Sequence, residues 1–445
     1  MSKQTADYFD IVIVGGGMAG ATMALALAPL QLNIAIIEVH PYQEQQTQPS
    51  FDDRCLALSW SSRQIYAAMG LWDQLTQTDS GKDKDNDNYA AIKHIHVSDR
   101  GHFGAVRLSH QEEGVPALGY VVESRVIGEV LLAQLKQHNN IHIYNPAQVE
   151  QVDNQSRTDK VSLTIKVGKK TQHLDSALLI IADGVNSRTR ESLGIRVNQR
   201  SYAQTAIIAN IETELPHQNV AYERFTDTGP LAMLPLSRKR CSLVWTAKDH
   251  QVKDIMAWDD RQFGEALQDR FGFRLGAITR VGKRSAYPLV LMTLDNRTLQ
   301  GQPRVALIGN AAHGIHPVAG QGFNLGLRDI AALAELIAAD IQQHKTPDPG
   351  DSRLLSDYWQ WRQADIRQVT TITNSLIKLF SNNSMVLTAL RDSGLLLTDI
   401  IAPLRHMIAA EAMGKGILQG QLSKMAVGQS LYKICNLYGS PHVCK

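Results

Sequence analysis

The fold is decided near the start of the chain, by the stretch DIVIVGGGMAG at residues 10–20. Its first part, residues 11–14, is apolar and β-branched, as a strand buried on both faces requires, and glycines follow at once. The spacing of Gly15, Gly17 and Gly20 predicts a tight turn, a backbone open to a pyrophosphate, and a helix from about residue 21 to 28 packed against the strand. The free N–H groups at the start of that helix would face an anion.

A second apolar strand is predicted at residues 33–37, and it ends in Glu38. This acid follows the glycines at about the twenty-residue distance at which a carboxylate accepts hydrogen bonds from the adenosine ribose hydroxyls. The pattern therefore predicts a dinucleotide with a free 2′-hydroxyl. It does not separate NAD from FAD, and an ordinary strand–helix turn without a ligand stays open as the alternative.

Two later segments favour FAD. Apolar strands are predicted at residues 177–182 and 304–308, and polar residues follow them at once, namely Asp183, Gly184, Gly309 and Asn310. Ligands of open α/β sheets lie at the carboxyl ends of the strands, where a carboxylate or an amide can hold a polyhydroxyl chain. FAD has such a chain and NAD does not. Two strand-terminal turns without a ligand remain the alternative interpretation.

A helix is predicted from about residue 325 to 341, directly after Gly320, Gln321, Gly322 and Asn324. Its N-terminus can stabilise the negative charge that a reduced flavin carries near its pyrimidine carbonyl. These four residues are therefore predicted to bind the cofactor.

The stretch GNAAHGIHPVAGQGFNLG at residues 309–326 resembles the third motif of the aromatic-ring flavoprotein monooxygenases of the para-hydroxybenzoate hydroxylase type, and among them the ubiquinone-biosynthesis hydroxylases. The resemblance extends from about residue 8 to at least residue 365. One branch, which acts on a polyprenylated methoxyphenol, is also similar at residues 97–102, 223–226, 229–235, 241–245 and 282–289. Asn310 stands where many relatives have Asp, and an amide can still accept a ribityl hydroxyl.

The resemblance implies an FAD-dependent monooxygenase that hydroxylates the ring of a polyprenylated phenol in ubiquinone biosynthesis. It implies O2 as co-substrate and a C4a-hydroperoxyflavin as the oxygen donor. NAD(P)H or another electron donor would bind transiently, near residues 183–188. Two alternatives stay open: a related hydroxylase acting on another ring position or another phenol, and a flavin-holding scaffold of the biosynthetic assembly without turnover. Other ubiquinone-biosynthesis proteins are the expected partners.

Further site residues follow from the same resemblance. Arg54, after Asp53, matches an Asp-Arg element that reaches the pyrophosphate or the flavin, and Arg125 is a weaker cofactor candidate. The residues predicted to line the substrate pocket are Tyr222, Arg224, Pro230, His316 and Pro317. That they are sheet core instead is an equally open interpretation. No catalytic base is assigned.

The predicted fold class is α/β, in two interleaved domains. Residues 8–90, 121–197 and 282–344 form a Rossmann-like FAD-binding domain in this prediction, and residues 91–120 and 198–281 form a substrate-binding sheet over the flavin. A helical region follows at residues 345–445. It is expected to cap the core, and an amphipathic surface at about residues 395–417 that meets a membrane or partner proteins is the alternative.

Composition narrows the class of protein. The net charge of +2 suggests no nucleic-acid partner. The cysteines lie far apart in the sequence, which suits a reducing compartment, and no metal site is predicted from them or from the histidines at 94, 96, 313 and 316. No apolar run is long enough to span a bilayer, so a cytoplasmic protein is expected, with peripheral contact at the inner membrane as the alternative.

Overall fold

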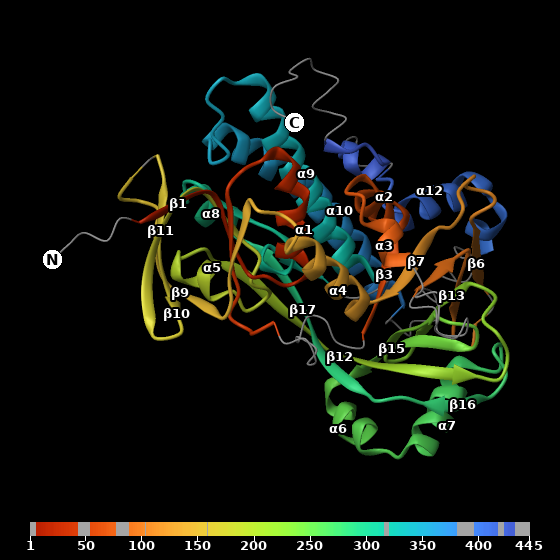
Figure 1. The fold of residues 1–445 in the computed structure, drawn as a ribbon. Coiled ribbons are helices and arrows are strands. Elements are labelled where there is room, and N and C mark those ends of the chain that lie inside the picture. The colour runs from red at the N-terminus through yellow and green to blue at the C-terminus, as the bar shows by residue number, and fades with distance from the viewer. Residues whose placement is uncertain are drawn as a thin grey trace.

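A computed structural model of the chain describes residues 6–42, 54–76, 89–102, 104–157, 159–315, 320–380, 396–416 and 422–431. Several residues named above lie outside these ranges, among them Asp53, His316 and Pro317. Figure 1 shows two sheets at opposite ends of the molecule with a layer of helices between them.

The first sheet is the predicted nucleotide-binding sheet. Its strand order is β8 (Ile141–Tyr144), β2 (Ile34–Ile37), β1 (Asp7–Val14), β11 (Lys170–Ile181), β10 (Val161–Val167) and β9 (Ala147–Asp153), with β18 (Val305–Leu307) also paired to β11. All pairs among β8, β2, β1, β11 and β18 are parallel. Alternate residues of β1 enter two separate cores, Ile11 and Ile13 on one face and Val12 and Val14 on the other. This two-sided burial explains why the segment is a continuous apolar run.

Helices cover one face of this sheet. α1 (Met18–Leu27), α4 (Ser124–Leu135) and α9 (Gln321–Gln343) share their core with Ile11 and Ile13, and α10 (Ser352–Phe380) packs against α9 (Figure 1). The predicted helix after the glycines is therefore confirmed, although it begins at Met18 rather than at about residue 21. Within the helical region predicted from residue 345, the structure describes the long helix α10.

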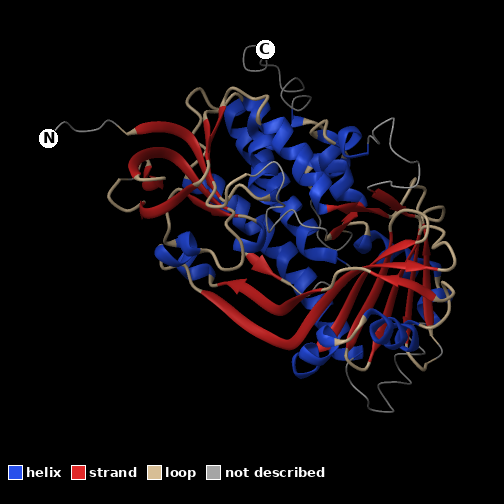
Figure 2. Ribbon diagram, turned by 60° about the horizontal axis from the view of Figure 1, so that its bottom comes forward, coloured by secondary structure: helices blue, strands red, loops and turns tan. Residues whose placement is uncertain are grey.

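The second sheet lies at the other end of the molecule. Its strand order is β19 (His313–Gly314), β17 (Ser285–Leu294), β12 (Val197–Thr213), β15 (Arg240–Lys248), β14 (Gly229–Pro235), β13 (Val220–Thr226), β5 (His94–Asp99) and β6 (Ala105–Ser109), with β16 (Ile278–Val281) paired to β12. α6 (Asp249–Ala257) and α7 (Asp260–Phe271) cover its outer face (Figures 1 and 2). The inner face is turned towards the first sheet.

One strand differs from the expected arrangement. We expected residues from 282 onwards to belong with the nucleotide-binding segments, but β17 pairs with β12 along most of its length and is a strand of the second sheet. The chain returns to the first sheet only at β18. The physical reason is that β17 is half-buried along its length, as a strand with one covered face is, and lacks the full burial of a central parallel strand. The domain limits themselves stay a prediction.

The remaining elements connect these layers. A small sheet of β3 (Cys55–Ser59), β7 (Gly119–Glu123) and β4 (Tyr89–Ile92) lies next to α2 (Trp60–Ala68) and leads into α4. The shorter helices are η1 (Ala28–Leu30), α3 (Trp72–Thr76), α5 (Arg188–Ser192), α8 (Asn296–Gln300), η2 (Gly309–Ala311), α12 (Ala402–Ala412) and η4 (Lys424–Val427). Among the helices that the structure describes, none combines the length and apolar character needed to cross a membrane.

Candidate active site

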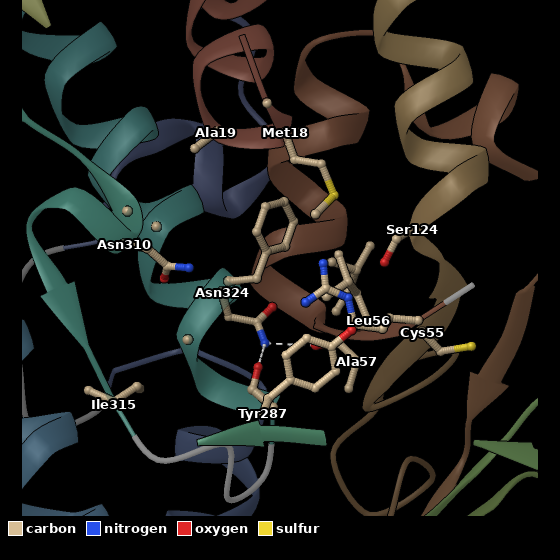
Figure 3. A pocket seen from close by; sticks show the side chains of 18 of the residues that line it. Met18, Ala19, Cys55, Leu56, Ala57, Ser124, Tyr287, Asn310, Ile315 and Asn324 are labelled. Carbon is tan, nitrogen blue, oxygen red and sulfur yellow. Dashed lines mark hydrogen bonds between the residues drawn. The ribbon is translucent and has the colours of Figure 1, made fainter. Parts of the chain in front are cut away.

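A cavity of about 1080 Å³ lies between the two sheets. Its polar half is formed where β1, β11 and β18 end, and its apolar half is the inner face of the second sheet. Figure 3 shows Met18 and Ala19 of α1 on one side of this space and Tyr287 of β17 on the other. The volume exceeds the ~300–1,000 Å³ of most small-molecule pockets, so it is sufficient for a large cofactor together with a second ligand.

The glycine turn after β1 has the geometry that its sequence predicts. Gly15 has a φ of +101°, and a Cβ there would come within 2.6 Å of the Ala182 carbonyl oxygen. A Cβ on Gly20 would lie 1.8 Å from the carbonyl oxygen of Gly15. Only glycine fits at these two positions, where helix, turn and neighbouring strand meet.

The N-terminus of α1 points into the cavity. Gly17 is its N-cap, and Gly17, Met18 and Ala19 all line the cavity wall. The first N–H groups of a helix have no partner inside the helix, and the helix dipole adds partial positive charge there. This end of the cavity therefore suits a phosphate or pyrophosphate.

Glu38 is buried at the end of β2 and lines the same half of the cavity. One carboxylate oxygen, Oε2, accepts a hydrogen bond from the Gly16 amide, and Oε1 accepts one from the His40 amide, each at 2.7 Å. These two bonds fix the orientation of the carboxylate. Each oxygen keeps a second lone pair, so Glu38 can still accept a ligand hydroxyl as predicted.

Asp183 presents an oxygen that lacks a partner. Its Oδ2 accepts a hydrogen bond from the Thr189 amide at 3.3 Å, whereas its Oδ1 is buried with no hydrogen-bond partner in the part of the chain that the structure describes. Asp183 and Gly184 both line the cavity, and Gly184 has a φ of +91°. A buried carboxylate oxygen without a donor is costly, so this atom fits a ligand that brings a hydroxyl group.

The two predicted polar turns are held together by Arg190. Its buried guanidinium donates to the carbonyl oxygens of Val185 and Ala311, each at 3.0 Å. Arg190 therefore joins the turn after β11 to the turn after β18, and its role is structural. Arg188, two residues before Arg190, lines the cavity.

The turn after β18 meets two helices at close range. Gly309 has a φ of +58°, and a Cβ there would lie 3.4 Å from the Ala19 side chain. From the other side, a Cβ on Gly326 of α9 would come within 3.1 Å of the Gly309 Cα atom. Asn310 follows, and its side chain lies in the cavity wall (Figure 3).

A buried charge network below this turn was missed by the sequence analysis. Asp329 of α9 accepts hydrogen bonds at Oδ2 from the Gly309 amide (2.9 Å) and His313 Nε2 (2.7 Å), and at Oδ1 from Arg362 Nε of α10 (2.7 Å). Burial alone would raise the pKa of Asp329, but the charges of His313 and Arg362 hold it below its usual range. The available signal was an Arg-Asp pair, Arg328 and Asp329, inside an otherwise apolar helix.

Asn324 has a structural role besides the cofactor contact that was predicted for it. Its amide Nδ2 donates to the carbonyl oxygens of Ala57 and Gly320, each at 2.8 Å, and its Oδ1 accepts from the Ser59 amide (2.9 Å) and Ser62 Oγ (2.6 Å). The side chain therefore joins α9 to β3 and α2, although it also borders the cavity (Figure 3). A direct contact with the cofactor stays a prediction.

Of the other residues predicted near the start of α9, two line the cavity and one does not. Gly320 has a φ of +64° and lines the cavity with Gly322. Gln321 is the first residue of α9 and is not part of the cavity wall.

The two predicted arginines also differ. Arg54 lines the cavity, with its guanidinium 4.8 Å from the centre of the Tyr287 ring. Arg125 lies outside the cavity wall and pairs with Glu129 at 2.8 Å and Glu123 at 3.5 Å. The structure thus brings Arg54, but not Arg125, to the candidate site.

The second sheet provides the apolar half of the cavity. The residues that line it share an inward direction on their strands: Ile95, Val97, Val106, Leu108, Ala206, Ile208, Ala221, Phe225, Ala232, Leu234, Val244 and Leu289. Ile408 and Ala412 of α12 add to this wall. Such a surface excludes water and suits an aromatic ring or a hydrocarbon chain.

The predicted substrate residues on β13 and β14 are mostly turned away from this wall. The Tyr222 ring packs edge-on against Phe271 of α7 at 5.4 Å, on the outer face, so only part of Tyr222 borders the cavity. Arg224 is not in the wall, and Pro230 is buried outside it. The cause is the two-residue period of a strand, which places Tyr222 and Arg224 on the face opposite to the residue between them.

That intervening residue is Glu223, which the sequence analysis did not select. It lines the cavity among apolar neighbours, and burial raises the pKa of its carboxyl to about 7. An acid between apolar residues at alternate positions of a strand was the signal that could have identified it.

Comparisons with known proteins identify the family of the chain. The family model described as FAD binding domain matches residues 8–373. The chain is 35% identical over 405 residues to a ubiquinone hydroxylase, UbiL, of Rhodospirillum rubrum, covering 91% of this chain and 89% of the relative. It is 29% identical over 407 residues to the 3-demethoxyubiquinol 3-hydroxylase of Escherichia coli, covering 91% and 98%.

A solved structure has the same fold. The p-nitrophenol 4-monooxygenase of Pseudomonas putida superposes with a TM-score of 0.72 at 16% identity, covering 92% of this chain and 99% of that one. The two-domain arrangement of a nucleotide-binding sheet and a second sheet is thus shared, while the sequences have diverged widely.

Proposed function

Because the chain belongs to the FAD binding domain family and is an FAD-dependent aromatic monooxygenase, we propose that it hydroxylates a polyprenylated phenol of ubiquinone biosynthesis. The specific reaction in this proposal converts 2-octaprenyl-6-methoxyphenol to the corresponding benzoquinol. Support comes from relatives named as ubiquinone hydroxylases and from the sequence stretches similar to the branch that acts on a methoxyphenol.

The observation that carries the proposal is one cavity with two chemically different halves. In the polar half, Gly15, Gly17 and the start of α1 suit the pyrophosphate, and Glu38 suits the ribose. The unpartnered Oδ1 of Asp183 suits a ribityl hydroxyl. The apolar half then suits the ring and its prenyl tail.

The residues of this chain fit FAD, and a bound flavin supplies the oxygen transfer that no side chain can perform. The protein holds the ring of the phenol against an apolar wall and keeps water out of the reaction space. O2 as co-substrate and NAD(P)H, or another donor, as a transient source of electrons are parts of the same proposal.

The product of the reaction tests the substrate. Purified protein with its flavin content measured is supplied with NAD(P)H, O2 and the prenylated methoxyphenol, and the quinol is analysed by mass spectrometry. Formation of the product hydroxylated at one ring position, together with accumulation of the methoxyphenol in cells that lack the protein, would support the proposal. A product hydroxylated at another ring position, or turnover of other phenols only, would contradict this substrate assignment. Tight FAD without substrate-dependent O2 consumption would favour a flavin-holding scaffold.

A surface next to the cavity suggests where so hydrophobic a substrate enters. Leu396, Leu397 and Ile400 are 55%, 52% and 66% exposed, and Ile408 is both 39% exposed and part of the cavity wall. We propose that this surface, residues 396–408, makes peripheral contact with a membrane, so that the prenyl tail passes from lipid into the cavity.

Co-flotation with liposomes of phosphatidylethanolamine and phosphatidylglycerol tests this contact. Ile400→Glu should reduce the bound fraction severalfold, because a carboxylate on the contact surface resists transfer into lipid. Phe273, which is 75% exposed at the end of α7, offers a matched control, and Phe273→Glu should leave flotation unchanged. Equal flotation of both variants would contradict the proposed contact.

A further inference from the structure

Glu223 is placed in the floor of the apolar half of the cavity by its strand. β13 lies between β5 and β14, and the partners of Glu223 on these strands are Val97 and Ala232. Both partners line the cavity, as do Ala221 and Phe225, the residues two positions away along β13. The carboxyl is therefore surrounded by apolar side chains on the face where the ring of a substrate would lie.

Glu223 is a partly exposed residue of the cavity wall, and its carboxyl differs from those of the two buried acids around the site, Glu38 and Asp329. Glu38 accepts hydrogen bonds from two backbone amides, and Asp329 accepts them from a backbone amide, His313 and Arg362. Glu223 makes no hydrogen bond or ion pair with any residue inside the described ranges, yet it is in contact with the cavity. A carboxyl that faces an apolar cavity without such partners is left to a ligand, because transfer of a charged group into apolar surroundings without a hydrogen bond costs free energy.

The other titratable side chains of the cavity do not provide Glu223 with a hydrogen-bond or ion-pair partner. Most titratable side chains of the cavity wall come from the first sheet, from the loops that follow its strands, and from β3 and β17. They are Glu38, His40, Arg54, Cys55, Asp183, Arg188 and Tyr287. Tyr222 lies next to Glu223 on β13. The neighbouring strands β5 and β14 and the helix α12 contribute apolar residues to the wall. Burial is the cause of the raised pKa of Glu223, and no charged neighbour contributes to it.

We propose that Glu223 accepts the hydroxyl of the substrate phenol in a hydrogen bond and takes its proton when the ring is oxygenated. The inference rests on the proposed function. In this step the phenol O–H bond breaks, its electron pair stays on the phenol oxygen, and the proton forms a new O–H bond on the Glu223 carboxyl. The added oxygen atom comes from O2 and the reducing electrons from the nicotinamide or other donor of the proposed reaction.

The chemistry suits this placement. An electron-rich phenolate is attacked by an electrophilic oxygen more readily than the neutral phenol. A base is most effective when its pKa lies near the working pH, and the carboxyl of Glu223, raised to about 7, meets this condition. Of the predicted pocket residues that the structure describes, Tyr222, Arg224 and Pro230, none has a comparable group on the inner face, because Tyr222 and Arg224 are mostly turned outward and Pro230 lies outside the wall.

Binding of a nitrophenol to the FAD-loaded protein without an electron donor tests the assignment, because its ionised form has its own visible band. The band and the dissociation constant are followed by difference spectra from pH 5 to 9, for the wild type, Glu223→Gln and the control Glu212→Gln. Glu212 is on β12 of the same sheet but outside the cavity wall. Equal flavin content of the three proteins shows that each is folded.

The wild type and Glu212→Gln should bind the phenol with a pH-dependent affinity and change its ionisation on binding. Glu223→Gln should bind it about tenfold or more weakly at the optimum pH, because a hydrogen bond to a charged group is lost, and should keep only the pH dependence that comes from ionisation of the phenol itself. Identical profiles for Glu223→Gln and the wild type would overturn the assignment and leave the proposed function in place. Failure of the wild type to bind any phenol, including the prenylated methoxyphenol, would overturn both.

Discussion

The stability of the protein should depend on pH through Glu223, in a way that one substitution removes. Burial raises the pKa of this carboxyl from 4.5 to about 7 in the folded state. Because the folded pKa lies above the unfolded one, the folded state binds the proton more tightly. The contribution of the Glu223 carboxyl to the free energy of unfolding is fully present below about pH 4.5 and is lost as the pH rises to about 7.

The size of the effect follows from the same two values. The gap between 4.5 and about 7 corresponds to about 3 kcal/mol of unfolding free energy that is missing at pH 8. Glutamine has nearly the same shape and no charge, so Glu223→Gln should not have this penalty. The variant should be more stable than the wild type at pH 8, and its advantage should grow by about 2 kcal/mol between pH 5.5 and pH 8.

Urea unfolding of the FAD-loaded, substrate-free protein measures this difference, with tryptophan fluorescence followed at several pH values. Glu212→Gln is the control for replacing a glutamate of the same sheet outside the cavity wall. A stability gap between Glu223→Gln and the wild type that does not change between pH 5.5 and 8 would refute the reasoning, since it would mean that Glu223 titrates alike in the folded and unfolded chain.

Three further predictions concern the cofactor half of the site. Gly17→Val should abolish FAD retention, because a branched side chain would block the approach of the pyrophosphate, whereas Asn310→Ala should only weaken it. The flavin-to-protein absorbance ratio after gel filtration measures FAD retention in the two variants. Full retention in Gly17→Val would count against the placement of the pyrophosphate at Gly17. Gly20→Ala should yield little folded protein, because its Cβ would lie 1.8 Å from a carbonyl oxygen, and a normal yield of soluble protein with a native thermal midpoint would contradict this. Asp329→Asn should lower the unfolding free energy by roughly 3–5 kcal/mol, because Arg362 would keep its buried charge without this counter-ion, and an unchanged urea midpoint would contradict that estimate.

Features that depend on a short stretch of chain were predicted from the sequence. The strand before Gly15, the helix after Gly20 and the position of Glu38 follow from local apolar periodicity and from glycine spacing. The structure adds the physical reason, which is the lack of space for a Cβ at Gly15 and Gly20. The same local signals predicted the strand that ends before Gly309.

Features that depend on how distant elements pack could not be predicted. The sequence indicates that alternate residues of β13 face opposite ways, but only the position of α7 shows that Tyr222 is outward and Glu223 inward. Three of the four hydrogen bonds of Asn324 need β3 and α2, more than 260 residues earlier in the chain. A hydrogen bond between α9 and α10, such as the one from Arg362 to Asp329, leaves no periodic pattern.

The cavity wall is assembled from residues that span almost the whole chain, from Val14 to Ala412. The ribosome synthesises these segments in order, from the N-terminus to the C-terminus. The residues of the glycine turn are therefore synthesised long before the residues of α12 that complete the cavity wall. The finished site can exist only after residue 412 has emerged. A chain cut short before α12 would carry the nucleotide-binding turn without the part of the cavity wall that Ile408 and Ala412 provide.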